Sequence, residues 1–144
     1  FSEYTFKNGR PITKSMLTLR MMLNEKQSLP LLSQQFDIEH IYSRKRQENE
    51  KGLSNNRQID LLGNKSLLEK RVNIRASDYR FEDKIKYYQG FDNSRGQRIG
   101  GTENLELKNI SNVYKKFGEK EIVERTNLFI DDFMNLLDKN GLIA

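Results

Sequence analysis

The sequence predicts an α+β fold that is mostly helical, with one small β-hairpin between an N-terminal helix and a C-terminal helical group. Three observations support this prediction. Apolar residues recur at helical spacing near both ends, two short apolar runs lie in the middle, and turn-forming residues separate these segments. The length of 144 residues is typical of one domain, so we expect residues 1–144 to form a single unit.

The first helix is expected over residues 12–26. Its apolar residues recur at helical spacing: Ile12, Met16, Leu19 and Leu23. Pro11 suits the first turn, where a missing N–H costs little, and Leu29-Pro30 interrupts the pattern. Apolar and acidic residues then alternate over 36–39, which predicts a short strand.

The middle of the chain is expected to return as a second strand and then turn into helices. Residues 43–57 are polar, charged and rich in Asn, which indicates a loop. Apolar runs at 59–62 and 66–68 predict a strand that lies beside the first. A helix is expected to open over 70–74, and a further helix is expected over 79–88.

Two more helices are expected after a flexible loop. Residues 90–101 contain Gly, Asn, Ser and Arg and predict the loop, and residues 105–117 predict a helix. The final helix has a sustained apolar stripe: Ile122, Phe129, Ile130, Phe133 and Leu137. Gly141 lies just beyond the stripe as a stop signal.

Basic charge is concentrated in the centre of the chain. The net charge is +5, but residues 44–75 hold nine Lys or Arg against four Asp or Glu. Residues 119–144 hold three against six, so the C-terminal segment is acidic. A basic central stretch favours a surface that binds a polyanion such as nucleic acid, although an ordinary solvated surface has the same composition.

Composition excludes several other classes of protein. Cysteine is absent, which rules out disulfides and a thiolate zinc site and leaves the cytoplasm as the default compartment. The chain has no run of about 18 apolar residues, so we expect no membrane span. Because it begins at Phe1 without a signal-like segment, we expect it to be a piece of a longer protein.

His40 is the single histidine, and it follows Asp37 and Glu39 at the end of the first expected strand. A carboxylate beside a histidine can hold a divalent cation while the imidazole takes a proton from water. Hydrolysis of a phosphodiester needs both groups. A lone histidine is nevertheless more often structural than catalytic, so its neighbours carry the argument.

Asn64 and Asn73 lie nine residues apart and flank a Leu-Leu pair. Both side chains reach one place only if the chain changes from strand to helix between them. The alternative is a turn Asn after Gly63 and an unrelated Asn near a helix end. His40 upstream favours the first interpretation.

In this order and spacing the chain resembles HNH (ββα-metal) endonucleases, and most closely the C-terminal HNH-like domain of GmrSD-type modification-dependent restriction enzymes. The residues that carry the resemblance are Ile38-Glu39-His40-Ile41, Gly63-Asn64, Leu67-Leu68-Glu69, Asn73, Phe81-Glu82-Asp83-Lys84 and Ile122-Val123-Glu124-Arg125. The resemblance implies a ββα-metal hairpin–helix core flanked by N- and C-terminal helices. Two departures are Ser43, where many relatives have Pro, and the absence of a bracing Cys pair at Glu69 and Val72.

The resemblance also implies a role for each residue in metal-dependent DNA cleavage. His40 would deprotonate the attacking water, and Asn64 would orient its loop. Glu39 and Asn73 would hold one Mg²⁺ or Mn²⁺ through oxygen, with Asp37 as a reserve ligand. The residues expected to hold the DNA backbone are Arg44, Lys45, Arg46, Lys70, Arg71 and Lys84.

The expected function is therefore a DNA endonuclease domain of a restriction or phage-defence system that acts on modified or foreign DNA. Relatives join this domain to an N-terminal nucleotide-dependent domain, so that domain of a parent protein is an expected partner. The main alternative is a degenerate HNH-like module that only binds DNA. A helical interaction domain, in which His40 and the two Asn are incidental, is a third hypothesis.

Overall fold

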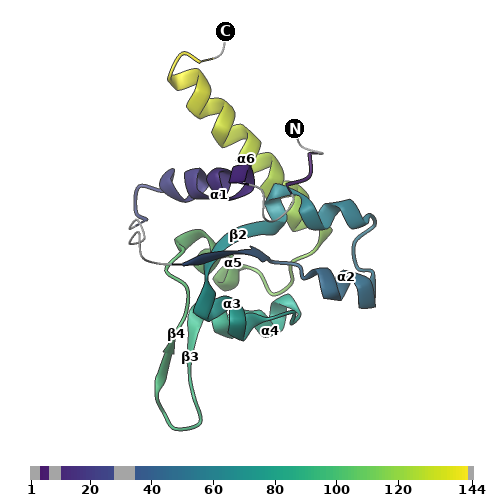
Figure 1. Cartoon of the computed structure of the whole chain (residues 1–144), viewed down its shortest axis with the longest axis vertical. Helices are drawn as coiled ribbons and strands as arrows, with labels where there is room; N and C mark the ends of the chain where they lie inside the picture. Colours follow the sequence, from purple (N-terminus) through teal and green to yellow (C-terminus); the bar gives the residue numbers. More distant parts are fainter. Residues whose placement is uncertain (1–3, 7–10, 28–34, 143–144) are drawn as a thin grey trace.

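A computed structural model describes residues 4–6, 11–27 and 35–142 of the chain. In this part, a central hairpin lies between two groups of helices (Figure 1). One group contains α1 (Pro11–Met22) and α6 (Glu119–Lys139), and the other contains α3 (Lys70–Ala76), α4 (Phe81–Gln89) and α5 (Leu105–Val113). The expected mostly helical α+β architecture is therefore confirmed. In the described segments, no helix has the length and apolar character that crossing a bilayer requires.

The hairpin and the helix after it form a ββα unit. Strand β1 (Phe36–His40) pairs antiparallel with β2 (Lys65–Glu69), and His40 lies opposite Lys65. Helix α3 follows β2 without a loop, so the strand-to-helix change expected between Asn64 and Asn73 is present. The hairpin–helix core predicted from the motif spacing is confirmed.

Strand β2 is buried along its whole length because helices cover both of its faces. Leu67 belongs to a cluster with residues of α1 and α6, including Leu17 and Phe129. Its neighbour Leu68 faces the opposite cluster, with Val72 and Tyr88. Successive strand residues point to opposite faces, so the Leu-Leu pair joins the two halves of the core.

Three segments differ from the sequence-based expectations. The expected loop over 43–57 contains helix α2 (Arg44–Glu50), because the Ser43 hydroxyl caps its first turn by accepting from the Arg46 backbone N–H. The expected strand over 59–62 forms 3₁₀ turns (Asn56–Asp60 and Leu62–Asn64). The expected flexible loop over 90–101 is an ordered hairpin of β3 (Gly90–Asp92) and β4 (Arg98–Gly100).

Helix ends also differ by several residues. Helix α1 ends at Met22, earlier than expected, and α5 ends at Val113, whereas α6 runs from Glu119 to Lys139. The Leu29-Pro30 break lies outside the described residues.

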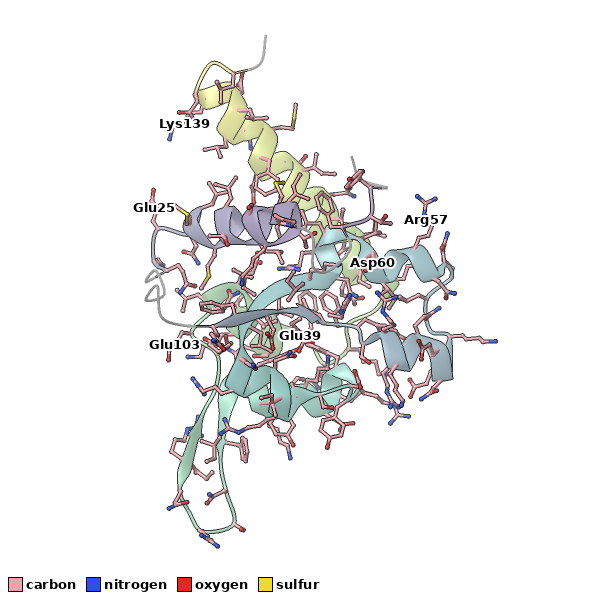
Figure 2. The ribbon with its side chains drawn as sticks, viewed as in Figure 1. Glu25, Glu39, Arg57, Asp60, Glu103 and Lys139 are labelled. Carbon is pink, nitrogen blue, oxygen red and sulfur yellow. The ribbon has the colours of Figure 1, made fainter. Side chains whose placement is uncertain are left out.

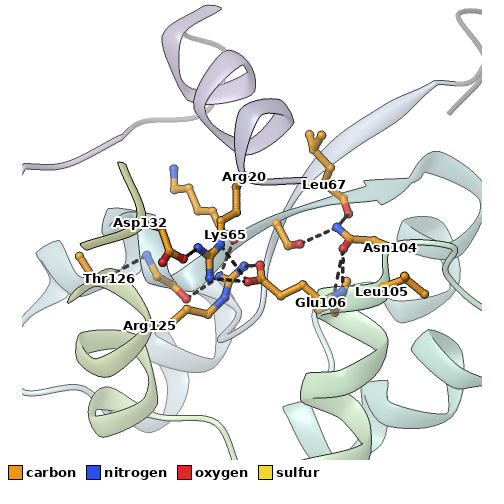
Figure 3. A network of polar contacts seen from close by, with 12 residues as sticks. Arg20, Lys65, Leu67, Asn104, Leu105, Glu106, Arg125, Thr126 and Asp132 are labelled. Atoms are coloured by element: carbon orange, nitrogen blue, oxygen red, sulfur yellow. Dashed lines mark hydrogen bonds and ion pairs between the residues drawn. The ribbon is translucent and has the colours of Figure 1, made fainter. Parts of the chain in front are cut away.

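A buried polar network fastens α1, α5 and α6 to the hairpin (Figure 3). The Arg125 guanidinium of α6 donates to the backbone carbonyls of Gly63 and Lys65 at 2.8 and 2.6 Å, and to Glu106 Oε1 at 2.6 Å. Arg20 of α1 donates to Glu106 Oε2 at 2.9 Å and pairs with Asp132. The Ile-x-x-Arg element near the C-terminus thus satisfies carbonyls at the start of β2.

Candidate active site on the hairpin and helix α3

A cleft of about 280 Å³ lies where β1, the start of α2, α3 and α4 meet. Its lining residues are Ile38, Glu39, His40, Ser43, Arg44, Asn73, Ile74, Ser77, Asp78 and Lys84. Several predicted site residues therefore come together at one place, among them His40 and Asn73, which are 33 positions apart in the sequence. Larger cavities elsewhere lack this combination of residues.

Asn64 is fully buried and braces the chain that follows His40. Its side-chain Oδ1 accepts from the Tyr42 backbone N–H at 2.7 Å, and its Nδ2 donates to the Tyr42 and Ile59 carbonyls at 3.0 Å. Gly63 is equally constrained, because a Cβ there would lie 2.1 Å from the Ile122 carbonyl oxygen of α6. The Gly63-Asn64 pair thus positions the His40 loop against the last helix.

The His40 imidazole lies in a buried charged cluster. Its Nε2 is 3.5 Å from Asp60 Oδ1, and the same carboxylate pairs with Lys65 and Arg44 at 3.2 Å. Burial and, to a smaller extent, Lys65 lower the pKa of His40 to about 4, although Asp60 opposes the shift. Burial would raise the pKa of Asp60, but the neighbouring cations outweigh it, so that pKa is lowered. At neutral pH His40 is therefore uncharged and Asp60 is ionised.

The single histidine makes this pKa directly measurable. We expect the C2–H proton NMR signal of His40 to titrate near pH 4 in the folded protein, against about 6.5 in an unfolded chain. The folded pKa is depressed, so the unfolded state binds more protons between pH 6.5 and 4. Folding stability should therefore fall by roughly 3 kcal/mol as the pH drops through this window, at about 1.4 kcal/mol per pKa unit.

Urea unfolding between pH 4 and 7 measures the stability change, and a matched variant tests its cause. Arg44 is one of the cations that lower the pKa of His40, so Arg44→Gln should raise the titration midpoint. A midpoint near 6.5 in the folded parent protein would contradict the buried environment.

Glu39 is buried among partners of its own. Its carboxylate accepts from Lys84 Nζ at 3.2 Å and from the Tyr88 hydroxyl at 2.9 Å, and Lys84 also donates to the His40 carbonyl at 2.8 Å. Figure 2 places Glu39 in the interior, between the hairpin and the lower helices. Burial raises the pKa of Glu39, and Lys84 and Tyr88 oppose that rise.

Lys84 is 0% exposed, so the expected DNA contact through its ammonium does not fit this structure. The physical reason is the ion pair with Glu39, which holds the lysine inside the core. Lys84 and Tyr88 each donate to one oxygen of the Glu39 carboxylate that we expected to hold a metal. Glu39 and Lys84 line the cleft as a structural unit that also supports the end of β1.

Asp37 of β1 and Asn73 of α3 are in direct contact. The Asn73 side chain donates to Asp37 Oδ2 at 2.9 Å, which joins helix α3 to strand β1. Both side chains are partly exposed. The pair offers two oxygen-bearing groups at one edge of the cleft.

Of the remaining basic residues that were expected to hold DNA, Arg44 lines the cleft. Arg44, Lys45 and Lys70 are exposed, and Arg44 also pairs with Asp60. Arg46 is half-buried and donates to the Asp78 carbonyl at 3.0 Å. Arg71 donates to the carbonyls of Gly100 and Gly101, as described below.

Sequence reasoning missed three residues of this site: Asp60, Lys65 and Tyr88. Asp60 stands inside an apolar run, Ile59 to Leu62, where an acidic residue needs a partner, and that signal was available. Lys65 is 0% exposed and donates to the Phe6 carbonyl as well as pairing with Asp60. The hydroxyl of Tyr88 has no sequence signal, because the periodicity shows only that its ring is buried.

The described residues contain no group of three or more His, Cys, Asp or Glu side chains arranged to hold a metal ion. A site built on Asp37 and Asn73 would therefore have two protein ligands. This donor set fits Mg²⁺ or Mn²⁺, because both prefer oxygen, and Mg²⁺ usually keeps several waters and binds one or two carboxylates together with substrate phosphates.

The fold and cleft define a ββα hairpin–helix domain with His at the end of its first strand, a bracing Asn before its second, and Asn on its helix. A family model described as GmrSD restriction endonucleases, C-terminal domain, matches residues 1–132, and the chain belongs to this family. The resemblance inferred from the motifs is thus confirmed. Neither a curated protein nor a solved structure matches the chain.

Proposed function

We propose that this domain is a metal-dependent DNA endonuclease that hydrolyses phosphodiester bonds within a restriction system. The observation that carries the proposal is the convergence of His40 and Asn73 on one cleft, with Asn73 hydrogen-bonded to Asp37. The family description supports DNA as the substrate and a further N-terminal region in a parent protein as a partner.

His40 is the proposed general base, and Asp60 is its positioning residue. Because Asp60 lies beside Nε2, we assign the proton of the neutral ring to Nε2 and the abstraction of the water proton to Nδ1. The imidazolium that forms would be stabilised by the ionised Asp60. A low pKa keeps the base unprotonated at neutral pH, although it also weakens its basicity.

Asp37 and Asn73 are the proposed metal ligands. When bound there, a divalent cation would supply positive charge against the phosphate and the leaving oxygen. Glu39 is assigned instead to the buried pair with Lys84, which fixes the backbone between Asp37 and His40. Exposed Arg44, Lys45 and Lys70 would hold phosphates of the backbone.

Two acidic residues of β1 make a matched test of the metal assignment. Asp37→Ala should weaken Mn²⁺ binding by tenfold or more, because it removes a ligand oxygen. Glu39→Gln should change Mn²⁺ binding little, because the carboxylate that it replaces faces Lys84 and Tyr88. Calorimetric titration with Mn²⁺ measures both without requiring cleavage, and the opposite ranking would overturn the assignment.

The alternative is a module that binds DNA without cutting it, and the sequestered carboxylate of Glu39 favours it. Nicking of supercoiled DNA separates the two functions. An endonuclease should convert supercoiled circles to nicked circles in Mg²⁺ or Mn²⁺ and stop in EDTA. A binding module would shift the DNA in a gel and leave it intact in every metal.

A further inference from the structure

The β3–β4 hairpin projects from the body of the domain as a two-stranded finger (Figure 1). Its strands pair Gly90 with Gly100, Phe91 with Ile99 and Asp92 with Arg98. The hydrophobic cores of the domain contain none of its residues. The burial of apolar side chains in these two clusters therefore does not account for the finger.

The root of the finger is attached to helices α3 and α4, and α3 also carries Asn73 of the candidate active site. Arg71 of helix α3 donates to the carbonyls of Gly100 and Gly101 at 2.9 and 3.0 Å. On the other strand, Phe91 packs edge-on against Tyr87 of α4, with ring centroids 5.4 Å apart. Since Asn73 lies on the same helix as Arg71, the finger and the cleft share one support.

The tip of the finger is an exposed turn with polar and basic side chains. Asn93 Oδ1 accepts from the backbone N–H groups of Arg95 and Gln97 at 2.9 Å, which builds the turn from its own side chain. Gly96 completes the turn at φ 75°, where L side chains are strained. Arg95, Gln97 and Arg98 are exposed around it, and Arg98, which is 62% exposed, pairs with Asp92 at 3.7 Å and donates to the Gln89 carbonyl at 3.3 Å.

The dimensions of the finger fit a DNA groove. Strands rise about 3.3 Å per residue, so each arm reaches roughly 15 Å from its root. The major groove of B-DNA is about 12 Å wide and 8.5 Å deep and admits a two-stranded β-ribbon. Arginine and glutamine are residues that donate to base edges in that groove, and arginine also pairs with phosphates.

We propose that the β3–β4 finger enters the major groove of duplex DNA beside the scissile phosphate, with Arg95 and Arg98 as its contact residues. This inference rests on the proposed function only for the identity of the substrate. It assigns Arg71 a positioning role, in which the guanidinium holds the finger on the metal-binding helix rather than contacting DNA itself.

The test compares two double variants that each remove two exposed positive charges. Arg95→Ala/Arg98→Ala alters the finger, and Lys120→Ala/Lys139→Ala alters α6, whose Lys139 end lies far from the finger (Figure 2). Affinity for a fluorescent 20-base-pair duplex is measured in EDTA at several salt concentrations. The finger variant should bind roughly 10- to 100-fold more weakly, and its salt slope should fall by about 2, whereas the control should change little.

A second duplex tests whether the finger contacts the major groove. Replacing guanine by 7-deazaguanine removes the N7 acceptor, which only the major groove presents. This duplex should bind the parent protein more weakly than normal DNA does, and the finger variant should bind the two duplexes equally.

Equal affinities of the two double variants for normal DNA would overturn the proposal and would instead indicate that the finger binds a protein partner. That outcome is separate from failure of the proposed function, which is absence of metal-dependent nicking by the parent protein.

Discussion

His40→Ala is expected to lower the rate of DNA nicking by about 10²–10⁴-fold while leaving duplex affinity nearly unchanged. The base acts on water in the transition state and contributes little to holding the DNA backbone. The measurement is conversion of supercoiled plasmid to nicked circles in Mn²⁺, with affinity for a short duplex measured in parallel. Nicked circles should precede linear product, because one site cuts one strand at a time.

Two comparisons separate catalysis from a structural role of the buried ring. Imidazole added to the buffer should restore part of the activity of His40→Ala, since it can occupy the vacated space and accept the proton. Asn73→Ala should also lose activity, but high Mn²⁺ should rescue part of it because the defect lies in metal binding. Nicking by His40→Ala at the parental rate would remove His40 from the mechanism.

Lys84→Met is expected to destabilise the domain by about 3–5 kcal/mol, because it leaves the carboxylate of Glu39 buried without its counter-charge. The double variant Glu39→Gln/Lys84→Met should recover much of this loss, since it removes both charges together. Urea unfolding of the two single variants and the double variant measures the free energy of interaction between Glu39 and Lys84. Lys86→Met on the same helix is the matched control, because Lys86 is exposed and should cost well under 1 kcal/mol.

The loss of folding stability in Lys84→Met should increase with pH. Burial already raises the pKa of Glu39, and loss of Lys84 removes the main opposing cause. The pKa of Glu39 is then higher in the folded state than in the unfolded state. The loss of folding stability from ionising Glu39 is therefore absent below the unfolded-state pKa and grows as the pH rises towards the folded-state pKa. The variant should therefore be more destabilised at pH 8 than at pH 5. Weak DNA binding by a fully stable Lys84→Met would instead restore the original assignment of Lys84 to the DNA surface.

The central motif could be predicted from the sequence because its spacing is a local property. The apolar–acidic alternation before His40 and the nine residues between Asn64 and Asn73 require a strand, a return and a helix, and the structure contains them. Helix α6 could also be predicted from the sequence, since its apolar residues recur at helical spacing. The resemblance to the family implied that Asn64 orients the His40 loop, and its side chain is hydrogen-bonded to the backbone of Tyr42.

Which side chains pair between helices and strands depends on the tertiary structure and could not be predicted from the sequence. Lys84 has the same charge as the exposed Lys86, and only the packing of α4 against β1 brings one of them to Glu39. The segment over 90–101 was expected to be a flexible loop because it contains four Gly residues together with Asn, Ser and Arg. It becomes a finger because Arg71 and Tyr87, from other elements, hold its two strands. Local periodicity determines which elements form, whereas burial and long-range pairing determine which charges face solvent, the core or a substrate.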